Sequence, residues 1–221
     1  MIDAVRCRHR DLCVIVVAAA VVVTGARAAR AGTRRGLESR VFAVLNGLDD
    51  CAFVPAWTVM QLGSLGGAIT TGAAVAAAGQ PRLGRRMAAV GALTWLGSKA
   101  VKPLVGRGRP ATEVDVARVL GAEQTGLGYP SGHAGVVVAM VAAAAPHLPW
   151  VLRPALWLAA LGVGGTRVYV GAHLPLDIAG GIALGIGTER GVRLLAGEGC
   201  TPTRHHGSSD TPRSARSSWR S

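Results

Sequence analysis

Apolar segments return six times along this chain, separated by short stretches that hold most of its charged residues. They are residues 12–26, 52–79, 87–102, 132–145, 154–170 and 174–195. The longer ones reach the length of about 20 residues that a helix needs to cross the hydrocarbon core of a bilayer. We therefore predict an all-α polytopic membrane protein, a bundle of about six transmembrane helices.

The composition agrees with helices that pack closely within a membrane. Half of the 221 residues are hydrophobic, the mean hydropathy is +0.36, and Gly alone accounts for 31 positions. Small residues let transmembrane helices approach one another where no hydrophobic effect drives them together. We expect one membrane-embedded domain over residues 1–196. Ser, Arg, Thr, Pro and Gly dominate residues 197–221, which predicts a disordered basic tail on the cytoplasmic side.

The first apolar segment follows a basic start and has two interpretations. It resembles a signal peptide, because Ala26-Arg27-Ala28 offers a small-x-small cleavage site. It also suits an uncleaved first transmembrane helix, which we favour because further apolar segments follow. After it, apolar residues recur at helical spacing, which predicts a short amphipathic helix lying at the membrane interface. These residues are Leu37, Val41, Leu45 and Leu48.

The basic residues between the apolar segments favour one orientation of the bundle. Six spans put both termini on one side, and with the termini inside most basic loops also fall inside, as the positive-inside rule prefers. The residues on that side are Arg82, Arg85, Arg86, Arg153, Arg190 and Arg193. Against the rule, the outer side would hold Arg27, Arg30, Arg34, Arg35 and Arg40. With this topology, the three polar clusters described next lie at the outer membrane face.

Charge and cysteine content exclude two other classes of protein. The formal net charge of +12 raises nucleic acid as a partner, but the arginines cluster beside apolar segments and no nucleic-acid recognition module is present. We therefore predict no nucleic-acid partner. The cysteines show no CxxC or Cys/His ligand spacing, so neither a zinc site nor a disulfide framework is predicted. They are Cys7, Cys13, Cys51 and Cys200.

The first polar cluster ends the third apolar segment. Lys102 and Arg109 flank Gly106 and Gly108, and Lys99 lies one helical turn before Lys102 on the same face. Glycines let the backbone bend close to a ligand and present its amides to an anion. Arg supplies a fork that matches phosphate oxygens, whereas Lys acts as a point charge. Taken alone, this cluster could equally be a basic anchor at the interface.

The second cluster, Pro130-Ser131-Gly132-His133, opens the fourth apolar segment. Ser131 occupies the position of a helix N-cap. The free amides of the helix start, together with the positive end of its dipole, attract an anion. His133 in that first turn could serve such a site or be a satisfied polar residue.

The third cluster places a cation, an imidazole and a carboxylate within eleven residues. Asp177 follows His173 by four residues, and Pro175 suits the first turn of a helix, so the two side chains share one face. A carboxylate bonded to one imidazole nitrogen leaves the other nitrogen free as a nucleophile. Arg167 precedes them, at the end of the fifth segment. A purely structural ion pair would also explain this cluster by itself.

Together the three clusters resemble the motifs of the type 2 phosphatidic acid phosphatase and haloperoxidase superfamily. They read Lys102-x6-Arg109-Pro110, then Pro130-Ser131-Gly132-His133, then Arg167-x5-His173-x3-Asp177. The order and the gaps, 19 residues and then 33 residues up to Arg167, are similar to those of the family. The resemblance covers about half the chain. Thr166 stands where the family usually has Ser, and because Thr keeps the hydroxyl donor we expect a small effect on phosphate binding at most.

The resemblance implies a role for each of these residues. His173 would attack phosphorus and carry a phosphohistidine, Asp177 would hold it in position, and His133 would protonate the leaving alkoxide and then activate water. The phosphate would be bound by Lys102, Arg109, Ser131, Gly132 and Arg167. No metal or other cofactor is expected, because fixed cations stabilise the charge and a divalent metal site would need more than one carboxylate.

The sequence thus predicts an integral membrane phosphatase that hydrolyses a lipid phosphomonoester or diphosphate at the outer face of the cell membrane. Its partners would be the bilayer and a lipid such as phosphatidic acid, phosphatidylglycerol phosphate or a polyprenyl diphosphate. One alternative is a metal-dependent intramembrane hydrolase that uses His133, His173 and Asp177 as ligands. Another is a lipid-phosphate carrier or binding protein, which would not need His173 beside Asp177.

Overall fold

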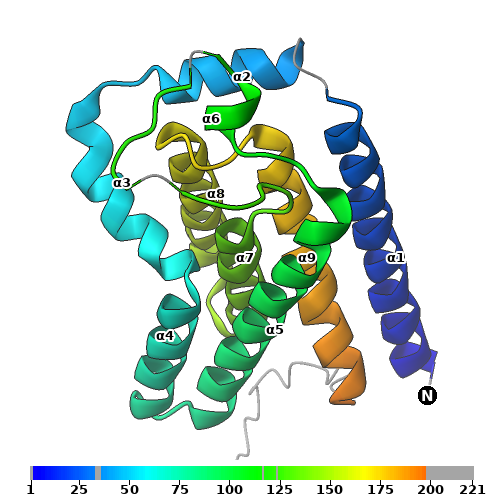
Figure 1. Cartoon of the computed structure of the whole chain (residues 1–221). Helices are drawn as coiled ribbons and strands as arrows, with labels where there is room; N and C mark the ends of the chain where they lie inside the picture. Colours follow the sequence, from blue (N-terminus) through cyan, green and yellow to red (C-terminus); the bar gives the residue numbers. More distant parts are fainter. Residues whose placement is uncertain (1, 33–35, 116, 123, 198–221) are drawn as a thin grey trace, which may run out of the picture.

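The structure, a computed structural model, describes residues 2–32, 36–115, 117–122 and 124–197, and these form helices and loops with no strand among them (Figure 1). The helices are α1 (Ile2–Arg30), α2 (Leu37–Asn46), α3 (Phe53–Met60), α4 (Leu65–Ala77), α5 (Pro81–Val105), α6 (Pro110–Glu113), α7 (Gly132–Ala144), α8 (Arg153–Tyr169) and α9 (Pro175–Leu195). The predicted all-α class is confirmed. The predicted tail, residues 197–221, lies outside the described residues except for Gly197.

Helix α7 forms the centre of the bundle. It packs against α5, α8 and α9, while α4 covers α5 and α1 covers α9 (Figure 1). Residues 134–143 are all buried and apolar or small, so α7 has no polar face. Val136 and Met140 face α5 in one core cluster, and Val137 and Val141 face α8 in another. This central helix holds the outer helices at fixed positions around its N-terminus.

Small residues set the spacing between α7 and α9. A Cβ atom at Gly135 would lie 2.9 Å from the carbonyl oxygen of Gly181, and one at Gly185 would lie 3.1 Å from the amide nitrogen of Ala139. The backbones of the two helices are therefore in direct contact, as expected for Gly-rich helix pairs. This close approach places the first turns of α7 and α9 beside each other.

Helix α1 is part of the bundle. It continues without a break through Ala26 and Ala28 and packs along α9. The buried Tyr129 lies between α1 and α9: its hydroxyl donates to the carbonyl of Val22 at 2.8 Å, and a Cβ at Gly180 of α9 would collide with its ring. A Cβ at Gly25 would lie 2.5 Å from that hydroxyl, so a larger residue there would displace the tyrosine.

The second apolar segment differs from the single span predicted over residues 52–79. Its helical parts, Asp50–Gly63 and Leu65–Ala77, meet at 72°. Gly63 lies at the break and faces the start of α7, where a Cβ would come within 2.5 Å of the carbonyl oxygen of His133. Ser64 then starts α4 afresh, because its hydroxyl accepts from the amide of Gly67 at 2.8 Å. The bend therefore follows from a contact with α7.

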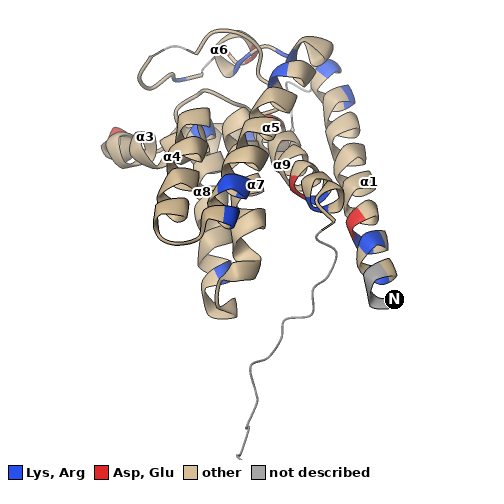
Figure 2. Cartoon of the chain, turned by 90° about the horizontal axis from the view of Figure 1, so that it is seen from below, with Lys and Arg blue, Asp and Glu red and all other residues tan. Residues whose placement is uncertain are grey.

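Two helical stretches among the described residues meet criteria of length and hydropathy for crossing a membrane. One is Val5–Arg30, and the other is the bent pair if its two halves count as one span. Helices α5 and α9 are long enough, about 38 and 32 Å at 1.5 Å per residue, but they carry charged residues at both ends. Figure 2 shows this pattern, with long uncharged stretches of helix and Lys and Arg in short segments. The predicted six spans exceed the number that meets these criteria.

The prediction for the cysteines is partly wrong. Cys13 and Cys51 are free thiols, but Cys7 is disulfide-bonded. Cys200 lies outside the described residues.

Candidate active site

The three polar clusters lie at one end of the bundle (Figure 1). Lys102 is in the last turn of α5, Ser131 immediately precedes α7, Arg167 is in the last turn of α8, and His173 and Asp177 flank the start of α9. Because α7 packs against α5, α8 and α9, these four helix ends meet. Residues up to 75 positions apart in the sequence thereby lie at one site.

Helix ends in this pocket follow from local sequence. Gly106 ends α5 with φ of 72°, a left-handed conformation that glycine adopts at little cost. Pro110 occupies the first turn of α6, and Pro175 occupies the first turn of α9. Asp177 is the third residue of α9 and accepts a hydrogen bond from the amide of Leu174 at 3.0 Å, so its carboxylate also caps that helix.

His173 and Asp177 form a buried pair. The imidazole Nδ1 lies 3.3 Å from Asp177 Oδ2, and the two residues are 2% and 0% exposed. Burial lowers the pKa of His173 well below its ordinary value, and the charges of nearby cations lower it further. The imidazole is therefore neutral. A carboxylate can only accept a hydrogen bond, so the proton of the neutral imidazole is on Nδ1. The lone pair is then on Nε2, which can act as a nucleophile.

Three predicted phosphate-binding cations reach this pocket, and in the described part of the chain they bond only neutral acceptors. Lys102 Nζ donates to the carbonyls of Leu127 and Gly128 at 2.6 and 2.9 Å. Arg109 donates to the carbonyls of Ala172 and Thr125 at 2.6 and 3.2 Å. Arg167 contacts Met60 Sδ at 3.2 Å and Gln124 Oε1 at 3.4 Å. Burial also lowers the pKa of Arg109, against the opposing charge of Asp177. Among the described residues, therefore, no carboxylate is bonded directly to these three cations, and Asp177 acts on Lys102 and Arg109 only at longer range.

The start of α7 contributes the residues of the second polar cluster to the same site. The amide of Ser131 donates to the main-chain carbonyl of Asp177 at 2.8 Å, which ties the second cluster to the third. The Ser131 hydroxyl is fully buried yet makes no hydrogen bond with the described residues, and the same holds for Arg167 Nε. These two groups leave hydrogen-bonding capacity at the site that a polar ligand could use.

His133 lies close enough to four of the other predicted residues for their charges to act on it. Its neighbours are Lys102, Arg109, Arg167 and His173. The structure thus brings together the eight residues predicted from the sequence. Lys99 is different, because it is exposed and its ammonium lies 5.4 Å from the ring centroid of Trp95. The hydroxyl of Thr166 donates to the carbonyl of Val163 at 2.8 Å, so it bonds its own helix.

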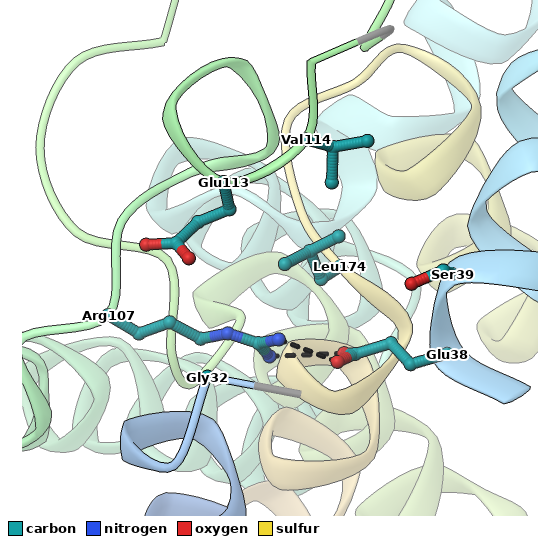
Figure 3. Close-up of a pocket in the computed structure, with 7 residues that line it drawn as sticks. All are labelled: Gly32, Glu38, Ser39, Arg107, Glu113, Val114 and Leu174. Carbon is teal, nitrogen blue, oxygen red and sulfur yellow. Dashed lines mark hydrogen bonds and ion pairs between the residues drawn. The ribbon is translucent and has the colours of Figure 1, made fainter. Parts of the chain in front are cut away.

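Sequence reasoning missed Arg107 and Glu38, which lie behind the His173–Asp177 pair. Figure 3 shows the Arg107 guanidinium directed at the carboxylate of Glu38. Arg107 also bonds Asp177 Oδ1 at 3.0 Å. Arg107 is one of several arginines in a basic stretch, and Glu38 is 69 residues away, so no sequence pattern joins them.

The donor set of the pocket does not suit a metal ion. Its carboxylate, Asp177, already pairs with His173 and Arg107, and the described residues contain no group of three or more His, Cys, Asp or Glu side chains that could hold a metal. Cations surround the two imidazoles, and like charge disfavours a further cation. The arrangement suits an anion instead.

Comparisons with known proteins agree with this geometry. The family model described as the PAP2 superfamily matches residues 83–197, which contain all eight predicted site residues. The fold is similar to the crystal structure of a transmembrane PAP2 type phosphatidylglycerolphosphate phosphatase from Bacillus subtilis. That match has a TM-score of 0.51 and 21% identity, and covers 90% of this chain and 98% of the other. None of the curated proteins matches the chain.

Proposed function

This chain belongs to the PAP2 superfamily, and we propose that it is an integral membrane phosphatase that hydrolyses a lipid phosphomonoester or diphosphate through a phosphohistidine. The observation that carries the proposal is that a neutral, buried His173 lies among cations that form no ion pair with a carboxylate in the described part of the chain. Lys102, Arg109 and Arg167 bond only neutral groups among the described residues, and a phosphate group supplies the missing negative charge. The unpartnered Ser131 hydroxyl would bond one of its oxygens.

In the first half-reaction, His173 Nε2 attacks phosphorus and forms a P–N bond. The bond from phosphorus to the leaving oxygen breaks, and its electron pair stays with that oxygen. His133 donates a proton to the leaving group, which departs as an alcohol or, from a diphosphate, as a monophosphate. The Nδ1–H group of His173 donates a hydrogen bond to Asp177 throughout, and the carboxylate stabilises the positive charge that develops on the imidazole.

In the second half-reaction, the now neutral His133 removes a proton from water, and the water oxygen attacks phosphorus. The P–N bond breaks, its electrons return to Nε2, and inorganic phosphate leaves. Charge on the equatorial oxygens is stabilised in both steps by the three cations, the Ser131 hydroxyl and the Gly132 amide at the start of α7. The free amides of a helix N-terminus suit this position.

The lipid substrate is the finer part of the proposal. The residues of the pocket recognise phosphate, so phosphatidic acid, phosphatidylglycerol phosphate and polyprenyl diphosphates are all candidates. The phosphatase from Bacillus subtilis named above is one protein of similar fold with a phosphatidylglycerolphosphate activity. The apolar surfaces of the bundle suit a substrate that arrives from the bilayer, and exposed residues such as Leu93, Leu96 and Leu158 contribute to them.

We also propose six spans with both termini inside the cell and the site on the outer side of the cell membrane. The exposed free thiol of Cys51 provides a native probe, because it lies just before α3 at the site end of the bundle. A membrane-impermeant maleimide should label wild type in intact cells and should not label Cys51→Ser. Labelling of Cys51 only after cell lysis would indicate the opposite orientation, with the site on the inner side of the membrane.

Phosphate release from a panel of the three lipid classes tests the function. Purified wild type is compared with His173→Ala, with a metal chelator present throughout. We expect release by wild type, none by His173→Ala, and no loss of wild-type activity in chelator. Equal release by both proteins would remove His173 as nucleophile, and sensitivity to the chelator would favour a metal-dependent hydrolase. Tight binding of the lipid by wild type without turnover would favour a carrier.

A further inference from the structure

Arg107 links Glu38 of α2 to the His173–Asp177 pair. It is 6% exposed, and its two terminal nitrogens are divided between two carboxylates. NH1 lies 3.0 Å from Asp177 Oδ1 and 3.1 Å from Glu38 Oε1, and NH2 lies 2.6 Å from Glu38 Oε2 (Figure 3). Burial acts to lower the pKa of Arg107, but the two carboxylates outweigh it and raise that pKa, so the guanidinium stays charged.

The contacts of Asp177 assign a separate task to each of its oxygens. Oδ2 accepts from His173 Nδ1 and from the amide of Leu174, whereas Oδ1 accepts from Arg107. Asp177 is 0% exposed, so Oδ1 has no contact with bulk water and relies on Arg107 as its partner. Two opposite attachments fix the rotation of the carboxylate, and this rotation directs Oδ2 at the imidazole.

Glu38 fixes Arg107 from the other side. Its Oε1 also accepts from the amide of Leu176 at 2.9 Å, so one carboxylate joins α2, the loop after α5 and the first turn of α9. The segment that precedes α7 also approaches Asp177 closely, because a Cβ at Gly128 would lie 2.9 Å from Asp177 Oδ2. Glu38, Arg107, Asp177 and His173 therefore form one continuous chain of hydrogen bonds and ion pairs.

We propose that Arg107 and Glu38 are positioning residues for the phosphoryl transfer, acting through Asp177 to hold His173 with Nε2 toward phosphorus. This inference rests on the proposed function. It goes beyond the predicted motif residues, since neither residue touches the substrate phosphate in this account. In metal enzymes, mutation of a residue that orients a metal-binding side chain typically lowers metal affinity or activity by about 10- to 100-fold. We expect an effect of similar size here.

The two residues should affect the pH profile in opposite directions. Removing the cation in Arg107→Gln lets Asp177 attract the imidazolium form of His173 more strongly, so the pKa of His173 rises and the acidic limb of kcat moves to higher pH, by about one unit. Removing the anion in Glu38→Gln moves it the other way, by less. The charged and titratable groups around His173 are Asp177, Arg167, Lys102, Arg109, Arg107, His133 and Glu38.

The experiment compares full-length Arg107→Gln, Arg107→Lys and Glu38→Gln with wild type on the best lipid of the panel. We expect kcat to fall about 100-fold in Arg107→Gln and about 10-fold in Glu38→Gln, with KM within about twofold, and Arg107→Lys to recover part of the loss. Arg118→Gln is the matched control. Arg118 bonds Asn46 at the end of α2 and Asp50 in the turn that follows, and it does not touch Asp177. The pH profile of Arg118→Gln should therefore match that of wild type.

Folding is checked by thermal unfolding in detergent, and Arg107→Lys and Glu38→Gln keep the inference testable if Arg107→Gln does not fold. Wild-type kcat and pH profile in all three variants, with His173→Ala inactive, would overturn the inference and leave the proposed function intact. A shift of the acidic limb in Arg118→Gln equal to that in Arg107→Gln would also overturn it. Absence of turnover by wild type on every lipid would instead reject the proposed function.

Discussion

The two ends of the bundle both bury charged residues, but they balance the charges differently. At the end opposite the site, Glu189 is 0% exposed and lies 2.6 Å from Arg86, 3.4 Å from Arg190 and 3.5 Å from Arg193. Asp11 of α1 adds a contact to Arg190 at 3.2 Å. Each of these arginines contacts at least one carboxylate. This is the arrangement of a structural ion-pair network.

Of the four cations described at the candidate site, three have no carboxylate partner among the described residues. Lys102, Arg109 and Arg167 bond carbonyls, an amide oxygen and a thioether, whereas Arg107 bonds the carboxylates of Glu38 and Asp177. Burying cations without counter-charge costs stability, so an arrangement of this kind indicates an anionic ligand. The comparison distinguishes cations that are placed to bind a ligand from cations that hold the structure together through carboxylates. Arg107 belongs with the structural cations.

Replacing a cation at each end should separate the two roles most strongly. Arg167→Ala should lower kcat/KM by about 1000-fold, because the transition-state charge loses a fixed donor. Arg193→Ala at the other end should leave kcat/KM within about twofold, because the site does not involve it. Steady-state phosphate release measures both. Equal losses in the two variants would break the distinction.

Replacing the carboxylate at the opposite end should affect folding instead of chemistry. Glu189→Gln leaves three arginines without their shared counter-ion in a buried position, so the free energy of unfolding should fall by about 3 kcal/mol. Denaturant unfolding in detergent measures this, and kcat per folded molecule should stay unchanged. Unchanged stability, or lost turnover in fully folded protein, would contradict the structural assignment.

The smallest effect is expected at Thr166. Its hydroxyl donates to the carbonyl of Val163, and a serine hydroxyl can make the same bond. Thr166→Ser should therefore change kcat/KM by less than about twofold, measured beside wild type on the same lipid. A larger change would mean that the hydroxyl turns toward the phosphate during the reaction.

Local sequence predicted much of the site because short-range signals end its helices. Gly106 ends α5, Ser131 precedes α7 and Pro175 starts α9, each where its residue type is favoured. The apolar segments between them then had to bring their polar ends together. The all-α class follows from the same segments.

Long-range contacts could not be predicted in this way. The bend after α3 depends on Gly63 meeting the carbonyl of His133, 70 residues later. Arg107 was indistinguishable from Arg109 by residue type, yet one turns to two carboxylates and the other to backbone carbonyls. Lys99 shares a predicted face with Lys102 but projects over Trp95. Side-chain direction at the end of a helix is set by its neighbours.

Trapping the covalent intermediate tests the central claim most directly. Wild type and His133→Ala are mixed with lipid substrate labelled with radioactive phosphate, quenched in base, and analysed for protein-bound label. The account predicts a label that is stable in base and labile in acid, as phosphohistidine is, located on His173 and enriched in His133→Ala because its release by water is slowed. Label elsewhere, or efficient turnover by His173→Ala, would contradict it.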